Sequence, residues 1–507
     1  MQSQDFDVLI IGAGISGIGA ACHLSRECPN RRVAIIERRK AMGGTWDLFR
    51  YPGIRSDSDM FTFGYNFRPW TNPKTLADGP SIKRYVMDAA RESGVDKKIH
   101  YGLSVTGAFW NSKDQQWTIE TLREENGEVQ SYTCSFLLIC TGYYNYDKGY
   151  KPDFPGEKDF EGRVIHPQQW PEDLDYSGKR VVVIGSGATA VTLIPAMADK
   201  TSHITMLQRS PTYMMSLPEV DPIASRLMGL LPEMATYRIM RARNIALQYW
   251  SFVISRKYPK QARELFLALA RWQLGKDIDM RHFTPSYNPW DERICAMPGG
   301  DLFKAIRSGR ASIVTDKIKT FIPNGILLES GKELEADIIV SATGLDLQFL
   351  GGMKLTVDGK VRLPREAMLY KSVLLEGIPN ASIVIGYTNA SWTLRADLAA
   401  EYLCRLLNHM DKKGYAVVTP VDREGCRTEE SVMGSLKSGY VYRAIDKMPR
   451  QGRHGPWKLT HNYYRDILML RKGVIEDQYL EFSRAKSPMS RSLTLHEMVD
   501  RVTKAAG

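Results

Sequence analysis

Two short glycine-rich segments constrain the fold of this chain more than any other feature. GAGISG covers residues 12–17, and GSGATA covers residues 185–190. Each follows an apolar run typical of a buried strand and precedes a helical pattern. A glycine turn between such a strand and helix is the fingerprint of a dinucleotide-binding unit, whose helix N-terminus faces the pyrophosphate. The sequence therefore predicts an α/β fold with two Rossmann-like dinucleotide-binding domains.

The first unit is expected to bind a dinucleotide with free ribose hydroxyls. Its second strand, RVAIIE, ends at Glu37, where a carboxylate can accept hydrogen bonds from a ribose. Among the glycines, one makes the tight turn, one admits the pyrophosphate and one lets helix and strand pack closely. The residues predicted to contact this dinucleotide are Gly12, Gly14, Ser16, Gly17 and Glu37.

In the second unit, a basic residue takes the position that Glu37 has in the first. Arg209 follows the strand HITMLQ. A guanidinium there can pair with the 2′-phosphate of NADPH, which a carboxylate would repel. A solvated charge at a strand end is the simpler alternative for Arg209. The predicted contacts of this unit are Gly185, Ser186, Gly187, Thr189, Ala190, Arg209 and Ser210.

Two dinucleotides in one chain imply hydride transfer between them, and FAD with NADPH is the most economical pair. A disulfide reductase has the same plan but needs a redox cysteine pair near the flavin, and residues 38–130 contain no cysteine. The segment GGTWDLFRYPGIRSD, residues 43–57, stands there instead. Its paired glycines permit close approach of the backbone to a cofactor, and its Pro-Gly turn delivers Arg55 and Asp57.

GGTWDLFRYPGIRSD resembles the [AG]GxWxxxx[FY]P[GM]xxxD motif of Baeyer–Villiger monooxygenases. FEGRVIHPQQWP, residues 160–171, resembles their FxGxxxHxxxW[PD] fingerprint at every fixed position. Segments such as MLQRSPTY and GYTNASWTLRADL resemble the ethionamide-activating branch of these flavin-containing monooxygenases. The resemblance implies oxidation of linear aliphatic or aryl-alkyl ketones by O₂ to esters, through a C4a-peroxyflavin, and oxidation of sulfides and thioamides. A flavin monooxygenase acting mainly on nitrogen or sulfur is the alternative.

The resemblance also implies roles for single residues. Arg293 matches the family's catalytic arginine, and Asp57 matches the carboxylate that orients it. Many family members have Lys before this arginine, where this chain has Glu292, so the NADPH preference depends more on the cation of the second unit. His166 and Trp170 of the fingerprint are expected to act at the hinge between the domains. The other expected cofactor contacts are Thr45, Trp46, Arg55 and Val105.

The predicted domain organisation is discontinuous. Helical periods in the middle of the chain predict an insertion in the NADP domain, whose Met, Trp and Tyr stripe is expected to be core and pocket wall rather than a membrane contact. The expected parts are the first part of the FAD domain, 1–145; a linker with the fingerprint and the first part of the NADP domain, 146–213; the mainly helical insertion, 214–294; the second part of the NADP domain, 295–345; and the second part of the FAD domain with the C-terminal region, 346–507.

Composition excludes several other classes of protein. The net charge is +11, but Lys and Arg are scattered, which favours a generally basic surface over a nucleic-acid-binding protein. Seven cysteines without a CxxC pair, mostly in apolar runs, predict buried thiols in a reducing cytosol. The N-terminus lacks a signal-peptide pattern, and the apolar stretch 244–255 is too short to span a bilayer. We therefore expect a cytoplasmic protein, at most peripheral to a membrane. The sequence predicts neither a metal site nor an oligomeric state.

Overall fold

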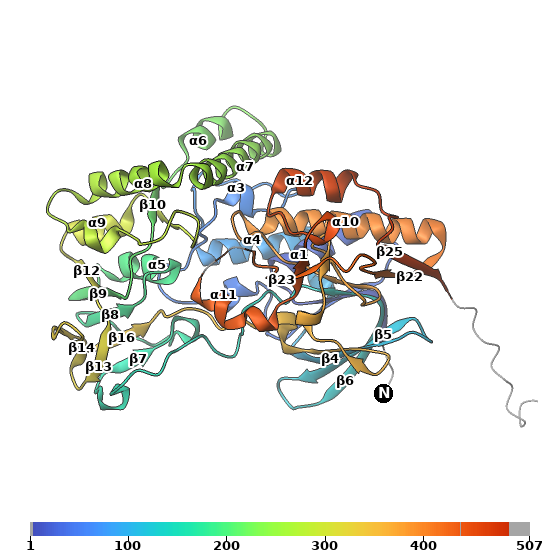
Figure 1. Ribbon diagram of the computed structural model, residues 1–507, viewed down its shortest axis with the longest axis horizontal. Helices are drawn as coiled ribbons and strands as arrows, with labels where there is room; N and C mark the ends of the chain where they lie inside the picture. The colour runs from blue at the N-terminus through green and yellow to red at the C-terminus, as the bar shows by residue number, and fades with distance from the viewer. Residues whose placement is uncertain (1–3, 435, 437, 486–507) are drawn as a thin grey trace, which may run out of the picture.

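The first glycine segment joins a central strand of the largest sheet to a helix packed on its face (Figure 1). β1 (Gln4–Ile11) lies parallel to and between β2 (Val33–Glu37) and β6 (Val129–Ile139), and the glycines lead into α1 (Ile15–Glu27). All five residues of β2 are buried, as expected for a parallel strand covered on both faces. The structure, a computed structural model, describes residues 4–434, 436 and 438–485.

Two distant parts of the chain build this sheet. β4 (Leu103–Asn111) and β5 (Gln116–Arg123) form an antiparallel meander with β6. The C-terminal part then adds β21 (Ala381–Ile383) parallel to β6, and α10 (Trp392–Lys413) packs against α1. The first dinucleotide-type unit is therefore completed only after the chain has returned from the second.

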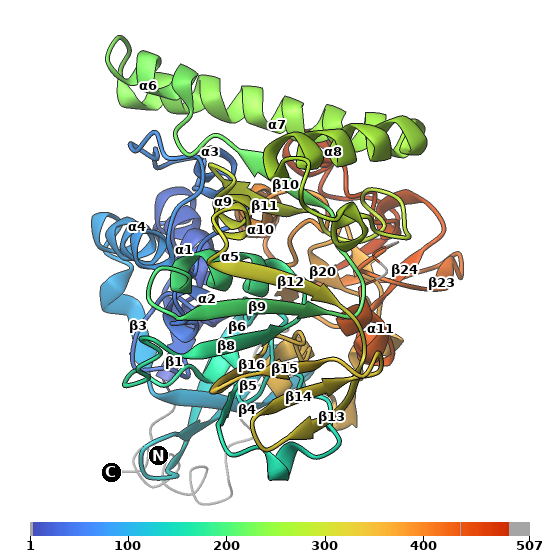
Figure 2. The same ribbon diagram turned by 90° about the vertical axis from the view of Figure 1, so that its left-hand side faces the viewer.

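The second glycine segment lies at the end of the central strand of a separate five-stranded sheet, shown face-on in Figure 2. β8 (Arg180–Ile184) leads through the glycines into α5 (Ala188–Met197), and all neighbouring strands are parallel. The sheet order is β12 (Ala311–Thr315), β9 (His203–Gln208), β8, β16 (Ile338–Ser341) and β7 (Arg163–Ile165). With the first unit, this sheet confirms the predicted pair of Rossmann-like folds.

The chain crosses between the two sheets twice, after β6 and after β16, and the two crossovers lie side by side. The backbone N–H of Asn145 donates to the carbonyl of Asp346 over 2.9 Å, and its side-chain amide donates to the Asp346 carboxylate over 2.8 Å. The N–H of Tyr150 donates to the carbonyl of Gly344 over 3.2 Å. These hydrogen bonds hold the two crossovers together as one double connection.

The predicted helical insertion forms one edge of the molecule, at the top of Figures 1 and 2. Its base is a parallel pair, β10 (Met214–Leu217) with β11 (Cys295–Pro298), and its helices are α6 (Pro222–Met228), α7 (Glu233–Lys257) and α8 (Pro259–Leu274). The prediction that its Met, Trp and Tyr stripe is core holds for Tyr237 and Met240, which are fully buried, and was wrong for its tryptophans. Trp250 is 57% exposed and Trp272 is 80% exposed, because each helix is covered on one face only.

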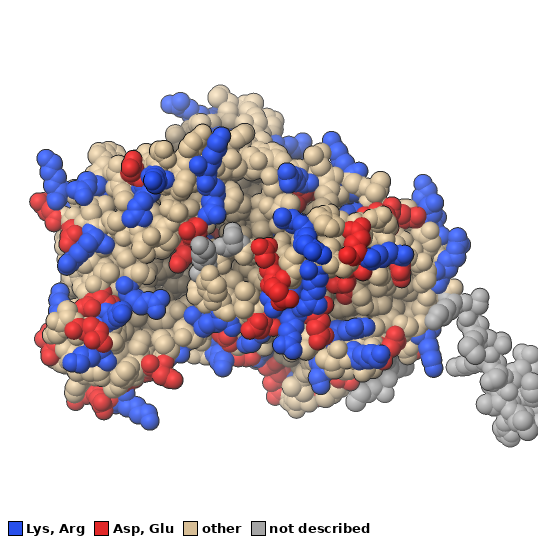
Figure 3. Space-filling view, in the orientation of Figure 1, with Lys and Arg blue, Asp and Glu red and all other residues tan. Residues whose placement is uncertain are grey.

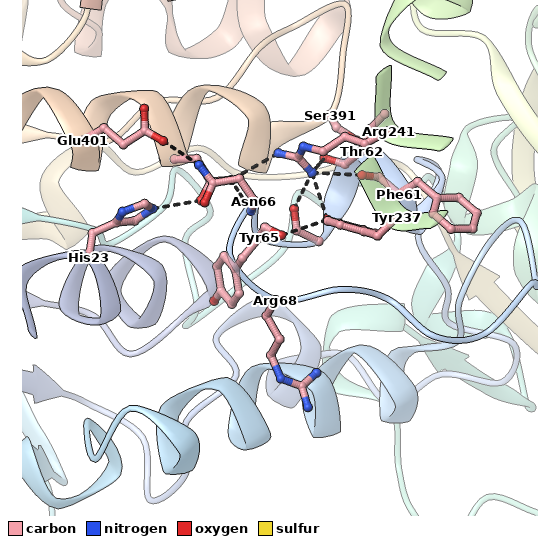
Figure 4. Close-up of polar contacts among 12 residues, drawn as sticks. His23, Phe61, Thr62, Tyr65, Asn66, Arg68, Tyr237, Arg241, Ser391 and Glu401 are labelled. Carbon is pink, nitrogen blue, oxygen red and sulfur yellow. Dashed lines mark hydrogen bonds and ion pairs between the residues drawn. The ribbon is translucent and has the colours of Figure 1, made fainter. Parts of the chain in front are cut away.

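A buried cluster around Arg241 holds α7 to the first unit (Figure 4). The Nη1 of Arg241 donates to the carbonyls of Phe61 and Gly64 over 2.9 and 2.7 Å, and its Nη2 contacts the Asp397 carboxylate on α10 over 3.1 Å. On the other side of Asp397, the Nε2 of His23 on α1 lies 3.4 Å from Oδ1. One carboxylate thus joins three helices that are far apart in the sequence.

The remaining helices and strands complete the described structure, in which no helix is both long and apolar enough to cross a bilayer. These elements are α2 (Thr45–Leu48), α3 (Met60–Phe63), α4 (Gly79–Glu92), α9 (Asp301–Arg307), α11 (Gly439–Ala444), α12 (Tyr463–Ile467), β3 (Ile99–Tyr101), β13 (Ile318–Ile322), β14 (Gly325–Leu328), β15 (Glu333–Glu335), β17 (Lys354–Val357), β18 (Lys360–Val361), β19 (Leu369–Tyr370), β20 (Leu374–Leu375), β22 (Tyr415–Pro420), β23 (Arg427–Ser431), β24 (Arg450–Gly452) and β25 (Leu480–Arg484).

Candidate active site

A cavity of about 1030 Å³ lies between the two sheets and reaches both glycine turns. Its size matches the upper end of the range for small-molecule sites, about 300 to 1,000 Å³. Side chains of the predicted cofactor loop, the crossovers, the segment before β11 and α11 line it. The insertion helices α6, α7 and α8 contribute no lining residue, so the expectation that they form the pocket wall was also wrong.

The first glycine turn has the close packing that its sequence predicts. Gly12 has a φ of +103°, and a Cβ atom there would lie 2.7 Å from the carbonyl oxygen of Cys140. A Cβ atom on Gly17 would lie 1.9 Å from the carbonyl oxygen of Gly12. Gly17 therefore lets the helix approach the turn and does not itself line the cavity, whereas Gly12 and Gly14 do.

Glu37 is held at the end of β2 by backbone donors. The N–H groups of Ala13 and Arg39 donate to its two carboxylate oxygens over 2.7 and 2.8 Å. Burial raises the pKa of Glu37, and these two hydrogen bonds act in the opposite direction. The carboxylate lines the cavity beside the N-terminus of α1, whose cap residue Gly14 offers no side-chain acceptor. The Glu37 carboxylate can still accept from a ribose hydroxyl, and the backbone N–H groups at the N-terminus of α1 can donate to a pyrophosphate.

The second turn leaves more room above its helix. A Cβ atom on Gly185 would lie 2.4 Å from the carbonyl oxygen of Ala342, but one on Gly187 would meet nothing within 4 Å. Packing within the chain therefore requires glycine at the first position and not at the second. Ala190, predicted to contact the dinucleotide, lies in the hydrophobic core behind the turn and does not line the cavity.

Arg209 lies exposed at the cavity wall and forms no ion pair with any residue that the structure describes. Next to it, the hydroxyl of Ser186 donates to the carbonyl of Ser210 over 3.1 Å. Glu292 lines the same part of the cavity. Burial raises the pKa of Glu292, while the positive charge of Arg209 lowers it. The guanidinium is thus open to an anionic group, but it has one acidic neighbour.

Arg293 and Asp57, predicted as a catalytic pair, meet across the cavity. The Nη1 of Arg293 lies 3.4 Å from the Oδ2 of Asp57, and the two side chains are 37% and 43% exposed. This exposed surface lines the cavity. The Nε of Arg293 is buried without a hydrogen-bond partner among the described residues. Only the exposed part of the side chain, and not this buried Nε, can meet a molecule bound in the cavity.

Tyrosines from separate segments surround Arg293, and the sequence did not point to them. Tyr143 and Tyr144 come from the first crossover and Tyr440 from α11. Burial raises the pKa of Tyr144 and of Tyr440 to about 12, so both are neutral phenols. Burial alone would lower the pKa of Arg293, but the negative charges of Asp57 and, at the high pH where they ionise, of the tyrosines raise it well above its usual range. Arg293 is a permanent cation in a largely aromatic wall.

Other predicted cofactor residues take different positions. Arg55 lines the cavity, but its guanidinium binds Asp301 at the start of α9, with Nη1 to Oδ2 at 2.5 Å. Ser16 accepts a hydrogen bond from the Nε1 of Trp392 over 2.8 Å, and Trp392 stacks on Tyr143 at a centroid distance of 5.2 Å. Trp392 is a further wall residue that the sequence did not single out. Four other residues predicted to contact the cofactors line the cavity: Thr45, Trp46, Val105 and Thr189.

The FEGRVIHPQQWP segment lies against the double connection. A Cβ atom on Gly149 would lie 1.9 Å from the ring of His166, so the imidazole packs directly on the first crossover. The side-chain amide of Gln168 donates to the carbonyl of Asn145 over 2.7 Å. Burial lowers the pKa of His166, which keeps the ring neutral. Trp170 packs against the core of the second unit and does not line the cavity.

Known proteins resemble this chain over nearly its whole length. The profile of the pyridine nucleotide-disulphide oxidoreductase family matches residues 9–225. MymA of Mycobacterium tuberculosis, named as an FAD-containing monooxygenase, is 57% identical over 489 residues, which are 96% of this chain and 99% of that protein. The FAD-containing monooxygenase EthA of the same species is 50% identical over 490 residues, 96% of this chain and 100% of that protein.

Solved structures share the fold at lower identity. A steroid monooxygenase bound to NADP superposes with a TM-score of 0.76 at 21% identity, over 95% of this chain and 100% of that one. A closed cyclohexanone monooxygenase superposes with a TM-score of 0.72 at 20% identity, over 96% of this chain and 100% of that one. From its similarity to MymA and EthA, the chain belongs to the family of FAD-containing monooxygenases.

Proposed function

We propose that this protein is an FAD- and NADPH-dependent Baeyer–Villiger monooxygenase that converts ketones to esters. The position of Arg293 carries the proposal: a cation paired with one carboxylate lies in the cavity between two dinucleotide turns. Insertion of oxygen beside a carbonyl group develops negative charge on the carbonyl oxygen. A fixed donor in a site that excludes water stabilises such charge best.

The two turns fit FAD and NADPH respectively. At the first turn, Glu37 can accept ribose hydroxyls, and the uncapped N-terminus of α1 can bind a pyrophosphate. At the second, the space above Gly187 admits a phosphate, and Arg209 can pair with a 2′-phosphate. When bound, NADPH supplies a hydride and the reduced flavin supplies the activation of O₂.

The chain's own contribution to the reaction is electrostatic. Arg293 holds negative charge without giving up a proton, because a guanidinium stays protonated at any working pH. Asp57 holds its Nη1 from one side, and the exposed part of the side chain faces the cavity, where a ligand can reach it. The rings of Tyr143 and Tyr440 line the same cavity and would help to exclude water around a bound substrate.

For the substrates we propose linear aliphatic and aryl-alkyl ketones, with sulfides and thioamides oxidised at sulfur in the same cavity. The motif resemblance supports this class, and the aromatic lining around Arg293 suits apolar substrates. The alternative is an enzyme that oxygenates mainly nitrogen or sulfur. It uses the same cofactors but forms no ester, so product identity separates the two.

The test is Arg293→Ala, with Arg293→Lys and the distant exposed Arg238→Ala as comparisons. We expect Arg293→Ala to retain FAD and to be reduced by NADPH, but to form ester about a hundredfold or more slowly, as when an oxyanion-hole donor is removed. The oxygen consumed should leave as hydrogen peroxide. Arg293→Lys should recover little, because a point charge replaces a planar fork.

Stopped-flow reduction and reoxidation, with product analysis on a panel of ketones, sulfides and amines, give the readouts. Normal ester formation by Arg293→Ala would remove this residue from the mechanism. A wild-type enzyme that yields sulfoxides or N-oxides but never an ester from any ketone would overturn the Baeyer–Villiger assignment and leave the alternative in its place.

A further inference from the structure

The outer face of the insertion carries most of the exposed apolar side chains of the described structure. Of 19 large apolar side chains that are exposed, 12 lie between residues 220 and 272. On α7, Ile239 and Trp250 lie away from the side that packs on the first unit, and on α8, Leu265 and Trp272 lie away from the side that carries the buried Phe266 and Ala270. We call the following exposed residues of α7, α8 and the loops beside them the outer apolar face: Leu230, Leu231, Ile239, Leu247, Trp250, Ile254, Tyr258, Leu265, Leu269 and Trp272.

Unpaired cations accompany this face. Residues 222–276 contain ten Lys and Arg against two Asp and Glu. Four of the ten arginines and lysines are bound internally, for example Arg241 to Asp397 and Arg256 to Asp291. The other six are exposed and form no ion pair with a described residue: Arg226, Arg238, Lys257, Lys260, Arg271 and Lys276. Figure 3 shows this upper edge as largely uncharged, with Lys and Arg side chains next to it.

The face is fixed in position. Arg241 and Tyr237, on the inner side of α7, are both buried, and the hydroxyl of Tyr237 donates to the carbonyl of Tyr65 over 2.9 Å. The cluster in Figure 4 therefore holds the outer side of α7 outward. The apolar side chains cannot be buried by a simple rotation of the helix.

We propose that the outer apolar face binds the surface of an anionic lipid bilayer, with α7 and α8 lying in the plane of the membrane interface. Amphipathic helices with Trp and Leu on one face and Lys or Arg at its borders bind in the interface between lipid headgroups and acyl chains. The cations add attraction to anionic headgroups. A second copy of the chain fits less well, because it would bring the same six unpaired cations against these ones.

The outer apolar face also lies near the candidate active site. Phe252 on α7 packs against Trp290 at a centroid distance of 5.5 Å, and Arg256 binds Asp291 over 2.6 Å. Arg293 is two residues after Asp291 in the sequence. A bilayer at this edge would therefore lie one helix layer from the cavity wall, where apolar molecules dissolved in the lipid are concentrated.

The test is flotation of the full-length holoenzyme with lipid vesicles. Vesicles of phosphatidylcholine alone are compared with vesicles rich in phosphatidylglycerol, each at low and high salt. We expect binding to the phosphatidylglycerol vesicles that weakens with salt, because salt screens the exposed cations. Two variants address the face directly: Trp250→Ser with Trp272→Ser, and Lys257→Glu with Lys260→Glu and Arg271→Glu. Each should reduce vesicle binding at least about tenfold.

The matched control is Val361→Ser with Leu363→Ser, which removes two exposed apolar side chains elsewhere on the molecule. It should bind vesicles like the wild type. All variants should oxidise a water-soluble substrate at the wild-type rate, because none of the changed residues lines the cavity.

Three results would overturn the proposal. The first is a wild-type protein that does not bind the anionic vesicles. The second is binding that the face variants leave unchanged. The third is a dimer in sedimentation analysis that the Trp variant dissociates, with no vesicle binding, which would assign the face to a second copy of the chain.

Discussion

Replacing Arg241 by Met tests whether one buried ion pair holds the insertion to the first unit. Methionine keeps much of the side-chain volume and removes the charge. The change leaves the Asp397 carboxylate without its arginine and takes the donor from the carbonyls of Phe61 and Gly64. Removing one partner of a buried pair typically costs about 3–5 kcal/mol. Because His23 and the N–H of Asn66 still contact Asp397, we expect the lower part of this range.

The protein has several cooperative units, so a single unfolding free energy is not the best measure. Native-state hydrogen exchange of α7 reports the loss locally. At about 1.4 kcal/mol for each factor of ten, a loss of about 3 to 4 kcal/mol should lower the protection of α7 amides by a factor of about 100 to 700. Protection of β8 should change much less. The exposed Arg238→Met on the same helix is the control and should stay within about 0.5 kcal/mol of wild type. A loss below about 1 kcal/mol in Arg241→Met would refute the idea that this pair anchors the insertion.

Four further outcomes are expected. Burial alone would lower the pKa of His23, but the Asp397 and Glu27 carboxylates raise it to about 9 from an ordinary 6.5. The stability that protonated His23 contributes is therefore complete below pH 6.5 and disappears as the pH rises through 9. Thermal scans should show a steeper loss of stability over this interval in wild type than in His23→Gln. Arg209→Ala should raise the KM for NADPH about tenfold to a hundredfold and leave the KM for NADH unchanged. Steady-state kinetics with both coenzymes measures this difference. Equal effects on both coenzymes would contradict the proposal that Arg209 pairs with the 2′-phosphate. Glu292→Lys should lower the KM for NADPH by removing the acidic neighbour of that cation. Gly187→Ala should fold with full FAD content but bind NADPH more weakly, because its methyl group enters open space that we assign to a phosphate.

The fold was predictable because its determining signals are local. A buried strand, a glycine turn and a helix lie within about 25 residues of one another in each unit, and close packing at Gly12, Gly17 and Gly185 explains why those positions carry glycine. Arg293 and Asp57 came from matching motifs, and the structure brings them together across 236 positions of sequence. Their roles stay predictions until the substitutions are made.

The rest required tertiary structure. Helical periodicity predicts that α7 is a helix, but it does not show which side of the helix packs on the protein, because both sides carry apolar residues. The side that carries Trp250 was therefore misassigned to the core. Trp392 and Tyr440 reach the cavity from the C-terminal part of the chain, and no local pattern marks a residue that closes a site from so far away. Ala190 has the spacing of a contact residue, but its side chain points into the core.

The insertion acts as a brace across the molecule. Its base strand β11 packs against α5 of the second unit, while Arg241 holds its long helix to the first. A rotation of the second unit about the double connection cannot leave both attachments undisturbed. We expect the chain between them to adjust to such a rotation. That chain includes Trp290, whose φ of +70° is unfavourable for an aromatic residue. Arg293 lies on this segment, so we expect relative motion of the two nucleotide-binding units to shift the residue that we propose as the catalytic cation.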